Sequence, residues 1–266
     1  MPSEFSDELG FARELARAGG GTAMAYFRRD PETKQKPDGT WVTEGDWAAE
    51  SAMRDQIKES FPDHNIHGEE EGLAAAGGGP AADGAPTWIL DPIDGTHNFM
   101  AGIPLWGTLV ALAVDGAPVL GVCHAPALDE TYEAARGSGA RMNGDAIHVD
   151  PVTDLAATTV LASGFESFEE AGLAGFYLDL VRASWRSRGF ADFWGHMLVA
   201  RGAAHIMAEP TLNVWDYAAV QPIVAEAGGR MSQFDGAPLA DGGSALTTNG
   251  VLHDGIIELF ASNRGF

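Results

Sequence analysis

The chain has 266 residues, with 38 acidic and 16 basic side chains, a net charge of −22 and 45% hydrophobic residues. This length is sufficient for one large or two small domains with a sizeable core. The negative charge makes nucleic acids and anionic membranes poor partners. Either solubility or carboxylates that hold cations would explain the charge, and composition alone does not separate the two.

A single cysteine, Cys123, excludes an intrachain disulfide and leaves a cysteine-based metal site short of ligands. No run of about 20 apolar residues suggests a membrane span. The first residues are partly acidic and lack the basic and then apolar pattern of a signal peptide. We therefore expect a cytoplasmic protein.

Helical spacing of apolar residues predicts a helix pair or one imperfect helix over residues 5–28, followed by a polar loop. A second helix is expected over residues 43–61, with a capping box formed by Thr43 and Asp46 and an end before Pro62. The glycine- and alanine-rich residues 71–86 are predicted to form a surface loop.

Strand patterns begin after this loop. Residues 88–90 predict a buried strand that Pro92 ends, and Asp115-Gly116 predicts a hairpin. The expected strands are 88–90, 109–114, 118–123, 131–135, 158–162, 204–208, 231–234 and 245–248, and the later helices are 168–183, 191–200, 215–227 and 252–261. This mixture predicts an α+β fold with a weak division into residues 1–150 and 151–266, together forming one compact unit.

The segment W-I-L-D-P-I-D-G-T places Asp91 and Asp94 at the end of a buried strand, directly before a predicted helix start at Gly95 and Thr96. Unsatisfied N–H groups at a helix start suit a phosphate. Carboxylates beside an anion require a cation between them, and oxygen ligands favour Mg²⁺. A lone D-x-x-D would more often be an Asx-turn with an ordinary helix cap, but the complete string favours a site.

Two further acidic positions lie in apolar surroundings. Glu69 and Glu70 follow a short apolar segment, and Asp216 lies in the first turn of an apolar helix. An acidic residue at a helix start usually stabilises the helix dipole. Together with the Asp91–Asp94 pair, however, these positions predict a cage for more than one metal ion.

Five segments resemble the signatures of the inositol monophosphatase family, in family order along nearly the whole chain. They are V-T-E-G-D (42–46), H-x-x-H-G-E-E (64–70), W-I-L-D-P-I-D-G-T (88–96), W-D-Y-A-A (215–219) and E-A-G-G-R (226–230). The resemblance implies a layered α-β-α-β-α sandwich of the inositol monophosphatase and fructose bisphosphatase type, commonly a homodimer. It also implies hydrolysis of small phosphate monoesters with two or three Mg²⁺ ions, and Mn²⁺ uses similar ligands.

The resemblance also implies a set of metal ligands. Glu69, Asp91 and the carbonyl group of Ile93 would bind one ion. Asp91, Asp94 and Asp216 would bind a second ion, and Glu69 would help to orient a loosely held third.

Further roles follow from the same resemblance. Thr96 and Asp46 would position and deprotonate the attacking water, with Glu69 nearby. The N–H groups of Gly95 and Thr96 would hold the phosphate. Lys36 matches a basic residue of an early loop in the family, and we include it among the candidate substrate-binding residues.

Two segments, residues 97–112 and 186–202, resemble the histidinol-phosphate phosphatase branch of the family. In the second segment, Asp192 stands where inositol phosphatases usually carry a small residue. Histidinol phosphate has an ammonium group that needs carboxylates beyond those on the metals, and Asp192 and Glu209 are the candidates. Glu209 suits inositol hydroxyls equally well. Asp192 is also explained as a helix N-cap, and His196, one turn later, is a predicted partner for it.

The leading hypothesis is Mg²⁺-dependent hydrolysis of L-histidinol phosphate to L-histidinol and phosphate, a step of histidine biosynthesis. An inositol-1-monophosphatase or a broad sugar-phosphate phosphatase is the alternative. A non-catalytic metal-binding homologue is disfavoured, because every motif position expected for catalysis is occupied.

Overall fold

The structure is a computed structural model that describes residues 4–37 and 39–263. The chain divides into two units, one of Met1–Asp145 with Trp215–Ile223 and one of Ala146–Val214 with Val224–Phe266. Mixed sheets and helices build both units, which confirms the predicted α+β class. The segment that carries Asp216 belongs to the first unit, whereas the sequence-based division grouped it with residues 151–266.

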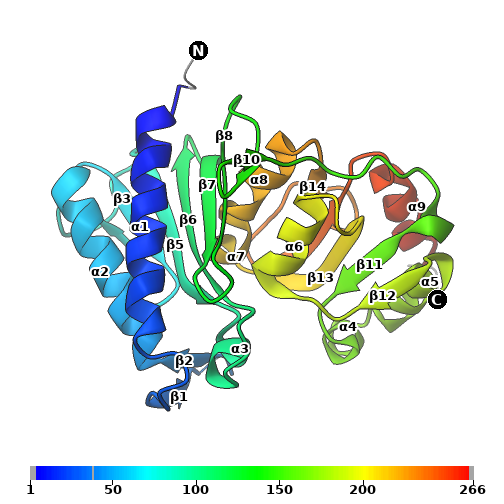
Figure 1. The fold of residues 1–266 in the computed structure, drawn as a ribbon, viewed down its shortest axis with the longest axis horizontal. Helices are drawn as coiled ribbons and strands as arrows, with labels where there is room; N and C mark the ends of the chain where they lie inside the picture. Colours follow the sequence, from blue (N-terminus) through cyan, green and yellow to red (C-terminus); the bar gives the residue numbers. More distant parts are fainter. Residues whose placement is uncertain (1–3, 38, 264–266) are drawn as a thin grey trace. The chain divides into compact units, whose positions relative to one another are not determined.

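The first unit contains an eight-stranded sheet (Figure 1). From edge to edge its strands are β10 (Asp145–Ala146), β9 (Arg141–Met142), β8 (Glu130–Ala135), β7 (Ala117–Ala125), β6 (Gly107–Val114), β5 (Thr87–Asp94), β3 (Asn65–Gly68) and β4 (Gly72–Ala75). Strands β3 and β5 run parallel, whereas β5 to β9 form an antiparallel meander. A separate ribbon pairs β1 (Thr33–Gln35) with β2 (Trp41–Thr43).

Helices α1 (Ser6–Met24) and α2 (Glu44–Ser60) cover one face of this sheet (Figure 1). Residues 5–28 therefore contain one long helix, which continues through the glycine run. Its buried residues Gly19 and Gly20 lie close to Met53 of α2 and His124 of β7, so that the helix packs tightly where a larger side chain would collide. The capping box predicted at the start of α2 is present.

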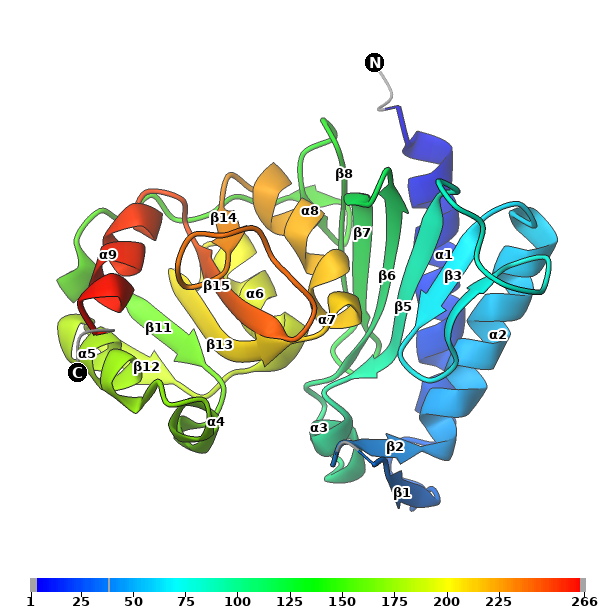
Figure 2. The same ribbon diagram turned by 180° about the vertical axis from the view of Figure 1, so that it is seen from behind.

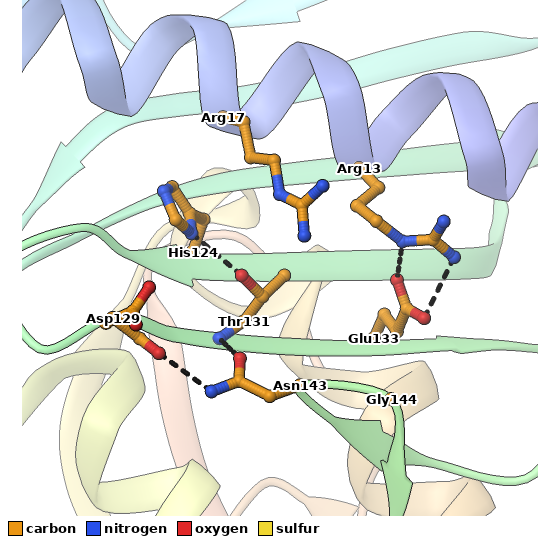
Figure 3. Close-up of a pocket in the computed structure, with 8 residues that line it drawn as sticks. All are labelled: Arg13, Arg17, His124, Asp129, Thr131, Glu133, Asn143 and Gly144. Atoms are coloured by element: carbon orange, nitrogen blue, oxygen red, sulfur yellow. Dashed lines mark hydrogen bonds and ion pairs between the residues drawn. The ribbon is translucent and has the colours of Figure 1, made fainter.

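A half-buried ion pair also joins α1 to β8 (Figure 3). The Arg13 guanidinium binds both carboxylate oxygens of Glu133, with Nη2 2.9 Å from Oε1. The pair lines a polar cavity of about 550 Å³ together with Arg17, His124 and Thr131, among others.

Helix α7 (Val214–Ala218) and the start of α8 (Val220–Glu226) belong to the first unit. The chain between them packs against β7, where a Cβ added at Gly121 would lie 2.0 Å from the carbonyl oxygen of Ala219. Residues 215–227 were predicted to form one helix, and this prediction is wrong. Pro222 has no N–H to donate to the Ala218 carbonyl, so the helix breaks at Ala219.

Two predicted boundaries near the sheet also differ. Gly72–Ala75, expected to be loop, forms the edge strand β4, because pairing with β3 outweighs the weak strand propensity of glycine and alanine. Strand β5 does not end at Pro92 but continues to Asp94, with an irregular register between Asp91 and Asp94. A proline is tolerated at such a bulge because no ladder donor is needed there. Helix α3 (Thr96–Met100) follows directly.

The second unit contains a five-stranded sheet (Figure 2). Its strands, from edge to edge, are β12 (Arg186–Arg188), β11 (Thr159–Ala162), β13 (Ile206–Leu212), β15 (Gly243–Thr248) and β14 (Arg230–Ser232). A short 3₁₀ helix, η1 (Leu155–Ala157), precedes β11. Strand β11 is parallel to β12 and β13, and the remaining pairs are antiparallel.

Helices cover both faces of this second sheet. One face carries α4 (Phe165–Glu170), α5 (Ala174–Ala183) and α9 (His253–Asn263), whose phenylalanines pack on Ile206 and Ala208. The other face carries α6 (Asp192–Ala200), which packs on Met207. Residues 168–183 were predicted as one helix, but Gly172, with a φ of +72°, separates α4 from α5. Among the described residues, no helix is both long and apolar enough to cross a bilayer.

The close approach at Gly121 makes a prediction about stability. Gly121→Ala should lower the free energy of unfolding by about 1–3 kcal/mol, because the new methyl group collides with backbone that cannot move aside. Gly21→Ala is the control, since Gly21 is exposed on α1 with open space around it. That change should raise stability by about 0.5–1 kcal/mol. Urea unfolding measures both, and a Gly121→Ala variant as stable as the parent would contradict this packing.

Candidate active site

The carboxyl ends of β3 and β5 bring Glu69 and Asp91 together. The two strands run parallel with Gly68 opposite Leu90, and the Glu69 N–H donates to the Leu90 carbonyl at 3.2 Å. Because neighbouring parallel strands end at the same edge of a sheet, the next side chains emerge side by side. The carboxyl groups of Glu69 and Asp91 interact directly.

Asp91, Asp94 and Asp216 form a carboxylate cluster. One oxygen of each lies within 4.8 Å of the others. The first two come from the irregular end of β5 and the third from α7. The rings of His67 on β3 and Trp215 on α7 meet edge to face with centroids 5.7 Å apart, which helps to hold the start of α7 near the end of β3.

The electrostatics of this cluster demand positive charge. Burial raises the pKa of Asp91 well above its usual range, and the neighbouring Glu69, Asp94 and Asp216 add to the effect. Burial also raises the pKa of Glu69, although Lys36 opposes this change. Buried carboxylates gathered in this way are costly unless a counter-charge is bound. Their all-oxygen donor set fits a hard divalent cation.

Lys36 places one positive charge beside Glu69, the acidic neighbour of this cluster. Its Nζ lies 2.9 Å from Glu69 Oε1 and 2.8 Å from Glu70 Oε1. Burial alone would lower the pKa of Lys36, but its contacts with the two carboxylates outweigh burial and raise it. Burial raises the pKa of Glu70 to about 7, although the bond from Lys36 opposes this shift.

The Asp46 carboxyl group is held in a fixed orientation in the first turn of α2. Its Oδ2 accepts hydrogen bonds from the N–H and the hydroxyl of Thr43, at 2.8 and 2.6 Å. Its Oδ1 is buried and has no hydrogen-bond partner among the described residues. Burial raises the pKa of Asp46 to about 6 against the opposing bonds from Thr43. A carboxylate with this pKa and one oriented, open lone pair is suited to accept a proton near neutral pH.

The turn after β5 is tied together by local hydrogen bonds. The Ile93 N–H donates to Asp91 Oδ1 at 3.0 Å, and the Thr96 hydroxyl donates to the Ile93 carbonyl at 3.1 Å. Gly95 precedes α3 with a φ of +85°, a left-handed conformation that favours glycine. The first N–H groups of α3 have no acceptor within the helix.

From the sequence, Glu70 was noted only as the neighbour of Glu69 in one acidic position, and Thr43 only as a helix cap. The signals for them were the Glu69–Glu70 doublet and a capping box with Asp46 in place of the usual glutamate. Asp46 is a shorter acid than glutamate, and it serves the cap with one oxygen only.

A second polar cluster lies within the second unit. His196 of α6 is buried, with Nε2 2.9 Å from Glu209 Oε2 and Nδ1 2.7 Å from Thr247 Oγ1. Its predicted partner was Asp192, one helical turn away. The observed bonds follow from strand geometry. Met207 on β13 packs against α6, and Glu209, two residues later, lies on the same face of the strand.

Asp192 lies beside Glu209 in this cluster. Its N–H donates to Glu209 Oε1 at 3.3 Å, and its φ is +58°. Burial and the charge of Glu209 raise the pKa of Asp192 to about 7. The alternative of a helix N-cap is wrong, because the N-cap of α6 is Ala191 and no side chain caps this helix. Glu209 also lines a cavity of about 400 Å³ with Ser163 and Thr211.

Comparison with known proteins places this geometry in a family. The model of the inositol monophosphatase family matches residues 6–264. The chain is 39% identical to the histidinol-phosphatase of Streptomyces coelicolor, with 97% of each chain covered. It is 40% identical to the histidinol-phosphatase of Mycobacterium tuberculosis, over 94% of this chain and 96% of that one. The solved structure of the Thermotoga maritima IMPase matches with a TM-score of 0.84 and 32% identity, over 96% of this chain and 97% of that one.

These similarities cover almost the whole chain and confirm the α+β sandwich fold and the phosphatase class expected from the motifs. The chain is a phosphoric monoester hydrolase from a family that is generally metal-dependent. It belongs to the inositol monophosphatase family.

Proposed function

We propose that this enzyme hydrolyses L-histidinol phosphate to L-histidinol and phosphate with Mg²⁺ as its cofactor. The observation that carries the metal-dependent part is the carboxylate cluster of Asp91, Asp94 and Asp216, whose oxygens lie within 4.8 Å of one another. A homodimer and a cytoplasmic location stay predictions from sequence.

The donors suit the proposed cation. Glu69, Asp91 and the Ile93 carbonyl would hold one Mg²⁺, and Asp91, Asp94 and Asp216 would hold another. All of these donors are oxygens, the ligand type that Mg²⁺ prefers, and Mn²⁺ accepts the same set. The Ile93 carbonyl already accepts the Thr96 hydroxyl and keeps a second lone pair for a cation.

The chain's own residues would then prepare the water. When bound, the divalent cations supply positive charge that acidifies water and offsets charge on the phosphate oxygens. Asp46 would take the proton on Oδ1, which has no hydrogen-bond partner among the described residues, and Thr43 would hold the carboxylate in orientation. We propose that Thr96 orients the water and that Glu69 assists.

The phosphate would be held by backbone. The N–H groups of Gly95 and Thr96, at the start of α3, are the proposed donors. Lys36 binds the carboxylates of Glu69 and Glu70, so we assign it first to charge balance. A contact between Lys36 and the phosphate remains a prediction.

The substrate assignment rests on two kinds of support. The two relatives compared above, at 39% and 40% identity, are both named histidinol-phosphatases. Asp192 and Glu209 also form a pair of neighbouring carboxyl groups, which suits a desolvated ammonium. We propose that this pair recognises the ammonium group of histidinol phosphate. Inositol 1-phosphate is the competing substrate, because the IMPase of Thermotoga maritima shares the fold.

A direct comparison of substrates tests this proposal. Phosphate release from L-histidinol phosphate and from inositol 1-phosphate should be measured side by side with Mg²⁺. We expect kcat/KM for histidinol phosphate to be at least about tenfold higher, which corresponds to about 1.4 kcal/mol. A tenfold preference for inositol 1-phosphate would reject histidinol phosphate as the substrate.

Replacing Asp192 tests the ammonium-binding role. Asp192→Asn removes the charge but keeps the shape, so KM for histidinol phosphate should rise about tenfold while inositol 1-phosphate hydrolysis changes little. In the parent enzyme, kcat/KM for histidinol phosphate divided by kcat/KM for inositol 1-phosphate should fall as the pH drops below about 7, where Asp192 becomes protonated and neutral. The variant should lose this pH dependence.

Asp179→Asn is the matched control, because Asp179 lies on α5 and pairs only loosely with Arg182 at 3.4 Å. It should leave both substrates unaffected. If Asp192→Asn slowed both substrates equally, Asp192 would have a structural role and the ammonium assignment would fail.

A further inference from the structure

A buried ion pair on α2 lies beneath the turn that carries Glu69. Glu50 is 0% exposed and Arg54 is 3% exposed. The Arg54 Nε donates to Glu50 Oε1 at 2.8 Å, one helical turn along α2. Neither residue lies in the five segments that resemble the family, and neither is a member of the Asp91–Asp94–Asp216 cluster.

Within the described part of the chain, the other hydrogen bonds of this pair go to the backbone of one turn, and Arg54 also lies 3.7 Å from the Glu71 carboxylate. Glu50 Oε2 accepts the N–H of Glu70 at 2.8 Å, and Oε1 accepts the N–H of Glu71 at 3.0 Å. The Arg54 Nη2 donates to the Gly72 carbonyl at 2.6 Å. The pair therefore holds both sides of the turn between β3 and β4.

Gly68 shows how closely the carboxylate approaches this turn. A Cβ added at Gly68 would lie 2.1 Å from Glu50 Oε1, so only glycine leaves space for the carboxylate. Gly68 directly precedes Glu69, and the Glu69 N–H is already held by Leu90 of β5. Residues 68–72 are thus anchored by the sheet on one side and by the ion pair on the other.

Stability alone does not account for this arrangement. Taking two charges out of water costs several kcal/mol for each ion, and an apolar pair of similar volume often stabilises a fold as well or better. What the ion pair adds is two acceptors and a donor in a defined geometry. These groups orient the backbone around Glu69, one of the proposed cation ligands.

We infer that Glu50 and Arg54 are positioning residues for divalent cation binding, because they hold the turn that places the Glu69 carboxylate beside Asp91. This inference rests on the proposed metal-dependent function. Neither residue is among the proposed cation ligands, and both hold the backbone of residues 70–72. The Glu50 charge also lies close enough to Glu69 to raise the pKa of Glu69, whose largest shift comes from burial.

Glu50→Gln tests the inference. The amide keeps one acceptor oxygen but places an NH₂ group against a backbone N–H, so the turn loses a bond. Substitution of residues that support metal ligands typically weakens metal affinity by about 10–100-fold. We therefore expect the dissociation constants of Mg²⁺ and Mn²⁺ in Glu50→Gln, measured by calorimetric titration, to be at least about tenfold higher than in the parent.

Glu133→Gln is the matched control. It removes the negative charge from the half-buried Arg13–Glu133 pair of the same unit, which ties α1 to β8 (Figure 3). This variant should lose stability in urea unfolding but keep the parent's cation affinity. Unchanged cation affinity in Glu50→Gln, or an equal loss in Glu133→Gln, would overturn the inference.

Two additions keep the outcome decisive. Arg54→Lys is the second variant, for use if Glu50→Gln does not fold. Lysine keeps the buried positive charge but cannot bond Glu50 and Gly72 at the same time as the arginine fork does, so this variant should also weaken cation binding. Amide hydrogen exchange at Glu70 and Glu71, measured without any cation, reports how firmly the N–H groups of the turn are held in hydrogen bonds. Exchange there should be faster in Glu50→Gln than in the parent. A parent enzyme that binds no cation would reject the proposed function, and unchanged exchange would separately reject the positioning role.

Discussion

The convergence of acidic side chains at one end of the eight-stranded sheet is the constraint on which the rest of the site depends. Asp91 is only 1% exposed, yet its carboxyl group faces Glu69, Asp94 and Asp216. Burial and mutual repulsion both oppose the charged forms, so side-chain attraction cannot assemble this cluster. The backbone must do it, through the parallel β3–β5 pair, the bulge around Pro92 and the packing of α7. A bound divalent cation would offset the repulsion between these carboxylates.

Much of this site was predictable because its key residues lie on one short, strongly patterned segment. The string from Trp88 to Thr96 encodes a buried strand, a bulge, a left-handed glycine and a helix start, all of which depend on local chemistry. The sequence marked Asp216 as a candidate through its place in the first turn of an apolar helix, but only the family resemblance paired it with Asp91 and Asp94. Its approach to Asp91 depends on packing between segments more than a hundred residues apart. Glu50 was not predicted, because its i,i+4 spacing to Arg54 is that of an ordinary helix surface pair. Nothing in the local sequence shows that this pair is buried against the turn after β3.

The errors in the predicted elements arise where contacts between distant segments outweigh local sequence preferences. Gly72–Ala75 forms a strand through pairing with β3, which the local composition does not indicate. His196 was expected beside Asp192 from helical spacing, but the histidine bonds to Glu209 on a neighbouring strand. The second unit thus holds a network of its own, in which His196 orients Glu209. Burial, and after it the charge of Glu209, raise the pKa of Asp192. We connect this network with substrate choice and the acidic cluster with the reaction itself.

The most direct test of the account is to locate the cation. Crystals of the protein soaked with saturating Mn²⁺ should be measured for anomalous scattering. We predict at least one strong peak held jointly by the carboxylates of Asp91, Asp94 and Asp216. Peaks only at other surface carboxylates, with none at this cluster, would contradict the central claim.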